Sequence, residues 1–133
     1  IKNKSDKLAV VKGYVWDETE AIRVKNFIER FCPQSKGGWT GNITLLPFQL
    51  EDIIFPFYAW KKPDGIRPRF DTLYWFGPRK HGKSQMGASL SAYHLCTESR
   101  SEILTLASTV EQSRWRVQHA QRVVPKAQCV SRW

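Results

Sequence analysis

The clearest sign of a fold lies in residues 72–84, which read Thr72-Leu73-Tyr74-Trp75-Phe76-Gly77-Pro78-Arg79-Lys80-His81-Gly82-Lys83-Ser84. The first five are β-branched, aliphatic or aromatic, a run that predicts a strand buried on both faces. The last eight match the phosphate-loop pattern G-x-x-x-x-G-K-[ST] in full. A strand before the loop and a helix behind it is the context in which such loops hold phosphate.

Each position of this loop has a physical role. Gly77 and Gly82 let the backbone curl so that successive N–H groups converge on phosphate oxygens. Lys83 is expected to contact the β- and γ-phosphates of ATP, and the Ser84 hydroxyl to complete the Mg²⁺ shell. The predicted nucleotide-binding residues of the loop are Gly77, Pro78, Arg79, Lys80, His81, Gly82, Lys83 and Ser84, with Ser84 as the metal ligand.

Two of these residues, Arg79 and Lys83, are also the candidate catalytic residues. Arg79 has two possible roles. It either stabilises charge that develops during γ-phosphate cleavage, as an arginine finger supplied in cis, or it has no catalytic role and forms a local ion pair or contacts phosphate only in the ground state. His81 is expected to be an ordinary loop residue.

The pattern after the loop alternates between helix and strand. Residues 83 to about 96 predict a helix, 103–107 a strand, 110–124 a helix and 127–130 a short strand. Strand, helix, strand, helix is typical of an α/β protein with a parallel sheet. The predicted fold class is therefore α/β, a RecA-like P-loop NTPase with flanking helices, incomplete in this chain.

The region before the loop predicts two helices. Residues 1–16 are interpreted as an extended N-terminal arm, and residues 17–133 as the ATPase domain. A helix opens at Asp17, with Glu20 three residues on as in a capping box. Its apolar stripe consists of Val24, Phe27, Ile28 and Phe31.

A second helix is expected to start at Pro47, beyond a glycine-rich loop at residues 34–42. Pro56 should kink it, because proline has no N–H to bond to the carbonyl of Asp52. Pro63-Asp64-Gly65 predicts a turn.

Composition limits the possible functions. The net charge is +9; residues 1–66 carry 10 basic and 8 acidic side chains, and residues 67–133 carry 11 and 4. This excess suits phosphate-bearing partners, although a basic surface that only aids solubility is equally compatible with it. Three scattered cysteines and three histidines have no metal-ligand spacing, which favours reduced, packed thiols. No membrane span or secretory signal is seen, so we expect a soluble, intracellular protein without membrane partners.

Several weaker motifs, taken in order, resemble the N-terminal ATPase region of tailed-bacteriophage large terminase subunits. The resemblance covers roughly residues 17–124 and depends on order and spacing more than on any single motif. It is carried by Phe31-Cys32, Trp39-Thr40-Gly41, Pro47-Phe48-Gln49, the loop from Pro78 to Ser84, and Leu106-Ala107-Ser108-Thr109 followed by Glu111-Gln112.

The resemblance implies an ATP-driven motor that translocates double-stranded DNA into a procapsid. Its cofactors would be ATP and Mg²⁺, and its partners the portal protein and the small terminase subunit. It would act as a ring oligomer in the bacterial host cytoplasm, transiently at the portal. Gln49 would bind adenine, for which its amide has both a donor and an acceptor, although alone it would be read as a solvated helix residue.

Part of an ATPase site is missing from the sequence. The acids after Ser84 are Glu98, Glu102 and Glu111, and none ends an apolar strand as a Walker B acid does. No nuclease domain follows. Since Ile1 is not an initiator Met, we expect either an excerpt of a longer enzyme or a natural truncation, with negligible hydrolysis by these residues alone. Two alternatives stay open: a fragment of another P-loop ATPase or helicase, and a truncated, non-catalytic terminase-derived interaction module.

Overall fold

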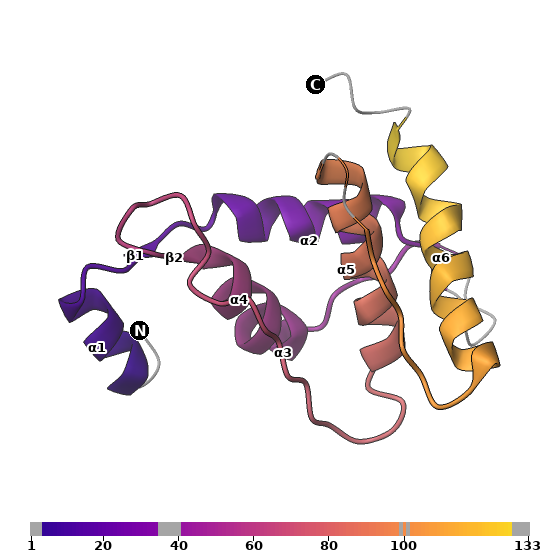
Figure 1. Ribbon diagram of the computed structural model, residues 1–133, viewed down its shortest axis with the longest axis horizontal. Helices are drawn as coiled ribbons and strands as arrows, with labels where there is room; N and C mark the ends of the chain where they lie inside the picture. The colour runs from indigo at the N-terminus through magenta and orange to yellow at the C-terminus, as the bar shows by residue number, and fades with distance from the viewer. Residues whose placement is uncertain (1–3, 35–40, 99, 101, 129–133) are drawn as a thin grey trace. The chain divides into compact units, whose positions relative to one another are not determined.

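The computed structural model describes residues 4–34, 41–98, 100 and 102–128, which are mostly helical (Figure 1). They form two compact units. The first consists of Ile1–Asn26 and Leu45–Tyr74, and the second of Phe27–Thr44 and Trp75–Trp133. Helix α2 belongs to both units, because the boundary after Asn26 falls within it.

The first unit contains short helices and one antiparallel strand pair. In this pair Trp16 lies opposite Trp60, and the two indoles meet edge to face with centroids 5.2 Å apart. Residues 4–11 are helical, whereas the sequence analysis predicted an extended arm. The elements are α1 (Lys4–Val11), β1 (Val15–Trp16), the start of α2 (Thr19–Phe31), α3 (Pro47–Gln49), η1 (Leu50–Ile54), α4 (Phe55–Ala59) and β2 (Trp60–Lys61).

Helix α2 confirms the helix predicted from Asp17, although its first residue is Thr19. The Asp17 carboxylate accepts hydrogen bonds from the Thr19 hydroxyl, at 2.6 Å, and the Thr19 N–H, at 3.0 Å. These bonds lower the pKa of Asp17, the hydroxyl contributing most. The predicted stripe faces inward, and Val24 and Ile28 are fully buried.

The helix predicted from Pro47 is interrupted by a π-helical turn. α3 passes into η1, where the Phe55 N–H bonds to the carbonyl of Leu50, and α4 follows. Pro56 explains the change, because its ring would clash with the carbonyl four residues earlier and it has no N–H to donate. A π turn is wider than an α turn and accommodates both effects.

Arg69 anchors the loop after β2. Its guanidinium lies over the rings of Tyr14, Trp60 and Phe70, with centroid distances of 5.3, 5.2 and 4.6 Å. Asp6 of α1 lies 3.9 Å away, so one side chain ties α1 to this loop. The turn predicted at residues 63–65 is confirmed: the Gly65 N–H bonds to the carbonyl of Lys62.

The second unit is built around two longer helices, α5 (Lys83–Thr97) and α6 (Val110–Gln128), which pack against each other. Both helices were predicted. α6 continues through Pro125 to Gln128, where the sequence analysis placed the start of a strand. The rest of that predicted strand lies outside the described residues. The core of the unit consists of Phe27, Ile28, Cys32, Met86, Ala88, Ala92, Tyr93, Ala120 and Val123.

The predicted parallel sheet is wrong. In the part of the chain that the structure describes, the only sheet is the antiparallel pair β1–β2. Residues 72–76 and 103–107 form no strand, and four of their large apolar side chains are exposed: Tyr74 (87%), Phe76 (90%), Leu104 (82%) and Leu106 (89%). A buried strand needs neighbouring strands for its backbone and helices on both faces. Neither segment has such strand neighbours here, so the α/β fold class is corrected to a mostly helical one.

Candidate phosphate-binding site

The loop at residues 77–84, which we call the phosphate loop, belongs to the second unit and leads directly into α5. Gly82 caps the helix with a left-handed backbone (φ 77°, ψ 10°), and its carbonyl accepts the first helical bond from Met86 at 2.8 Å. Lys80 is also left-handed (φ 67°), whereas His81 between them is not. Such reversals of backbone hand turn successive N–H groups toward a common point, which forms an anion-binding concavity.

The Lys83 ammonium lies inside this loop. Its Nζ donates to the carbonyl of Gly77, at 2.5 Å, and to the carbonyl of Pro78. These carbonyls occupy positions on the ammonium that phosphate oxygens could take. A phosphate group fits this arrangement, because the Lys83 cation already lies within the loop and the loop leads directly into the N-terminus of α5.

The remaining loop residues face solvent. Pro78, Arg79, Lys80 and His81 are exposed, and His81 Nδ1 lies 3.2 Å from the carbonyl of Arg79, to which it donates. Arg79 makes no ion pair with any described residue, so the local pairing considered for it is not seen there. Gly77 is closely approached: a Cβ at this position would lie 3.3 Å from the indole nitrogen of Trp75.

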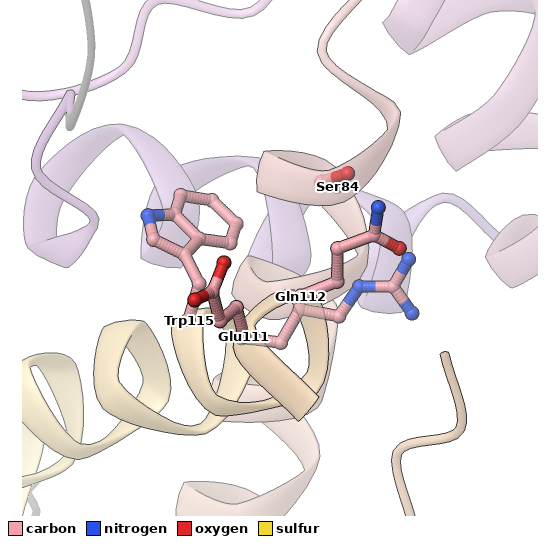
Figure 2. Close-up of a pocket in the computed structure, with 5 residues that line it drawn as sticks. Ser84, Glu111, Gln112 and Trp115 are labelled. Carbon is pink, nitrogen blue, oxygen red and sulfur yellow. The ribbon is translucent and has the colours of Figure 1, made fainter. Parts of the chain in front are cut away.

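Beside the loop lies a cavity of about 270 Å³ between the first turns of α5 and α6 (Figure 2). Its wall includes Ser84, the predicted Mg²⁺ ligand, which is exposed. The other lining residues are Glu111, Gln112, Trp115 and Arg116 of α6. Figure 2 shows Ser84 on α5 and the α6 side chains on the opposite wall.

These α6 residues were not predicted as site residues. Glu111 was considered as a Walker B acid and rejected, Glu111 and Gln112 were noted as part of the resemblance, and Trp115 and Arg116 had no predicted role. The pairs 111/115 and 112/116 are spaced by four residues, so they share one face of a helix. That spacing predicts a shared helix face, but which element this face meets depends on the packing of α6 against α5.

Trp115 stacks against His119 behind the cavity, and this contact holds its ring in place. Its indole lies parallel to the His119 ring, with centroids 5.5 Å apart and planes 21° apart. His119 is buried, and its Nε2 has no hydrogen-bond partner among the described residues. Burial lowers the pKa of His119, and the nearby Arg122 lowers it further. Histidine is therefore neutral here at physiological pH.

Gln49, the predicted adenine-binding residue, lies in the first unit and has a structural role there. It is buried, its side-chain oxygen accepts the Leu46 N–H at 2.9 Å, and its own N–H donates to the Leu46 carbonyl at 2.9 Å. This is half of a capping box at the start of α3. The sequence did not predict it because a capping box usually has Ser or Thr at the N-cap, where this chain has Leu46.

Cys32 and Cys96 are free thiols. Cys32 is buried, and desolvation raises its pKa to about 11, so it is an unreactive thiol at neutral pH. Among the residues that the structure describes, no three His, Cys, Asp or Glu side chains are grouped as metal ligands. Within the same residues, no helix is both long and apolar enough to cross a bilayer.

Comparison with known proteins adds no relative. No protein-family model, no curated protein and no solved structure matches this chain.

Proposed function

We propose that the phosphate loop binds the phosphates of ATP, with Mg²⁺ held at Ser84. The observation that carries the proposal is the position of the Lys83 ammonium, bound to the carbonyls of Gly77 and Pro78 within the loop. Because these are hydrogen bonds to neutral carbonyls, exchange for charged phosphate oxygens is favourable. The positive end of α5 points at the same anion.

The wider role is proposed from the sequence resemblance. The chain would supply the nucleotide-binding part of a motor that packages double-stranded DNA, acting with a portal and a small subunit. In that role Gln49 would contact adenine, and Arg79, exposed and unpaired within the described residues, would assist hydrolysis. Magnesium would neutralise charge on the β- and γ-phosphates.

The test is isothermal titration of the 133-residue chain with Mg²⁺ and a non-hydrolysable ATP analogue. Lys83→Ala should weaken binding by about tenfold or more, because it removes a charge-assisted bond to phosphate. The matched control is Lys12→Ala, an exposed lysine in the first unit. It removes the same charge and should bind like the wild type.

Two results would overturn the proposal. One is the absence of binding by a folded wild-type chain, with folding checked by far-UV circular dichroism. The other is equal affinity in the Lys83→Ala and Lys12→Ala variants, which would show that binding depends on net charge and not on the loop.

A further inference from the structure

The wall of the cavity beside Ser84 includes a cation that forms no ion pair with any described residue. Arg116 lines it, is half-buried, and makes no ion pair or hydrogen bond with any described residue. Glu111 lines the same cavity without pairing with it. A partly desolvated guanidinium in a cavity, with its donors unused, is suited to an anion.

The size of the cavity limits what it can hold. Complete small-molecule sites enclose roughly 300–1,000 Å³, and this cavity has about 270 Å³. It is thus suited to one end of a ligand whose remainder is held elsewhere. Ser84 belongs both to the cavity wall and to the phosphate loop, so the ligand held by that loop can also enter the cavity.

The residue chemistry indicates which end of the ligand enters. Arg116 presents a planar set of donors that matches phosphate oxygens in pairs. One face of the Trp115 ring is already covered by His119, which leaves less aromatic surface for a base. Glu111 would repel a bare phosphate but is compatible with a phosphate that carries a divalent cation.

We propose that this cavity receives the terminal phosphate of a nucleoside triphosphate bound at the phosphate loop, with Arg116 as its contact. The inference depends on the proposed function, because the loop must hold the rest of the nucleotide. It adds a specific consequence. Lys83 serves diphosphate and triphosphate alike, whereas Arg116 distinguishes the two, because only the triphosphate extends into the cavity.

The experiment compares Mg²⁺ with ADP and Mg²⁺ with a non-hydrolysable ATP analogue, both titrated into four forms of the chain. Arg116→Met keeps the apolar stem of the side chain and removes its charge. We expect it to weaken binding of the ATP analogue by about tenfold or more and to leave ADP affinity unchanged. Arg114→Met, on the exposed side of α6, should change neither. Lys83→Ala should weaken both.

The outcomes separate the two proposals. If Lys83→Ala weakens both ligands but Arg116→Met changes them by the same factor, including no change, the cavity does not hold the terminal phosphate. If Lys83→Ala has no effect on either, the proposed function itself fails. Thermal unfolding of each variant checks folding. If Arg116→Met unfolds, Arg116→Gln, which also removes the charge, replaces it, and the same ratio of affinities then decides.

Discussion

At the scale of single residues, the backbone of Lys80 is the most informative feature of the loop. A left-handed conformation costs a non-glycine residue about 1–3 kcal/mol, and it persists only where the surroundings enforce it. Here it falls two residues before Gly82, which has the same hand. The sequence pattern fixes Gly77, Gly82, Lys83 and Ser84 and leaves position 80 open, so the strain at Lys80 could not be predicted from it. Because Lys80 lies within the phosphate loop, we interpret this strain as functional.

His119 gives a pH dependence whose sign follows from its burial. Its pKa lies below its ordinary value of 6.5 in the folded chain, so the unfolded chain binds a proton more readily. The stability that its neutral form contributes is complete above pH 6.5 and is lost as the pH falls toward the lowered value. We therefore expect the free energy of unfolding to be smaller at about pH 5.5 than at about pH 7.5. Urea unfolding followed by circular dichroism measures it.

The control for this prediction uses two variants. His119→Phe keeps an aromatic ring beside Trp115 but cannot be protonated, so the difference between the two pH values should shrink. His81→Gln, in the exposed loop, should keep the wild-type difference. Equal differences in all three proteins would show that His119 does not cause the dependence.

At the scale of elements, variants of Gln49 test whether this motif residue stabilises the start of α3 or binds a ligand. Its side-chain oxygen accepts the Leu46 N–H at the start of α3. Gln49→Ala removes this acceptor and should lower the free energy of unfolding by about 1 kcal/mol. Gln49→Glu keeps an acceptor and should be close to wild type in stability. Urea unfolding of the two variants provides the comparison.

The same pair of variants examines adenine binding. Glutamate cannot donate the second bond to adenine, so Gln49→Glu should lose any preference for ATP over GTP if the residue reads the base. A Gln49→Glu chain that is stable and still prefers ATP would leave Gln49 with its capping role alone.

The elements also show what the sequence could predict. α2, α5 and α6 were predicted because a helix forms its bonds within four residues, and its stripe or its motif is readable locally. The strands at residues 72–76 and 103–107 were wrong because their bonds require partners distant in sequence. Composition alone made both segments resemble buried strands. α1 was missed because Lys4–Val11 contains no clear apolar stripe.

The candidate site, too, could be predicted only where its residues are close together in the sequence. The phosphate loop was predicted as a contiguous motif, and its helix begins at the expected residue, Lys83. The opposite wall of the cavity comes from α6, almost thirty residues later. Only the packing of α5 against α6 brings Arg116 to the cavity that Ser84 lines. Nothing in the local sequence around Arg116 specifies that neighbour.

At the scale of the whole molecule, the main question is which apolar side chains stabilise the fold by being buried. Each of the two compact units has its own buried residues, and the core of the second is dominated by helices. Most large apolar side chains of residues 72–76 and 103–107 contribute little to either core, since all but Trp75 and Ile103 are exposed. Exposed apolar side chains in unpaired segments favour association with other chains.

Matched substitutions in the second unit measure how much a buried and an exposed apolar side chain each contribute to the free energy of unfolding. Met86 on α5 is 4% exposed, and Leu106 is 89% exposed. Met86→Ala removes a buried side chain and should lower the free energy of unfolding by about 2–5 kcal/mol. Leu106→Ala removes a side chain that packs against little, so its effect should be within about 0.5 kcal/mol. Urea midpoints of both variants, measured at equal slope, give the two values. A loss for Leu106→Ala as large as that for Met86→Ala would mean that residues 103–107 are buried in the folded chain, and the helical description of this unit would then be wrong.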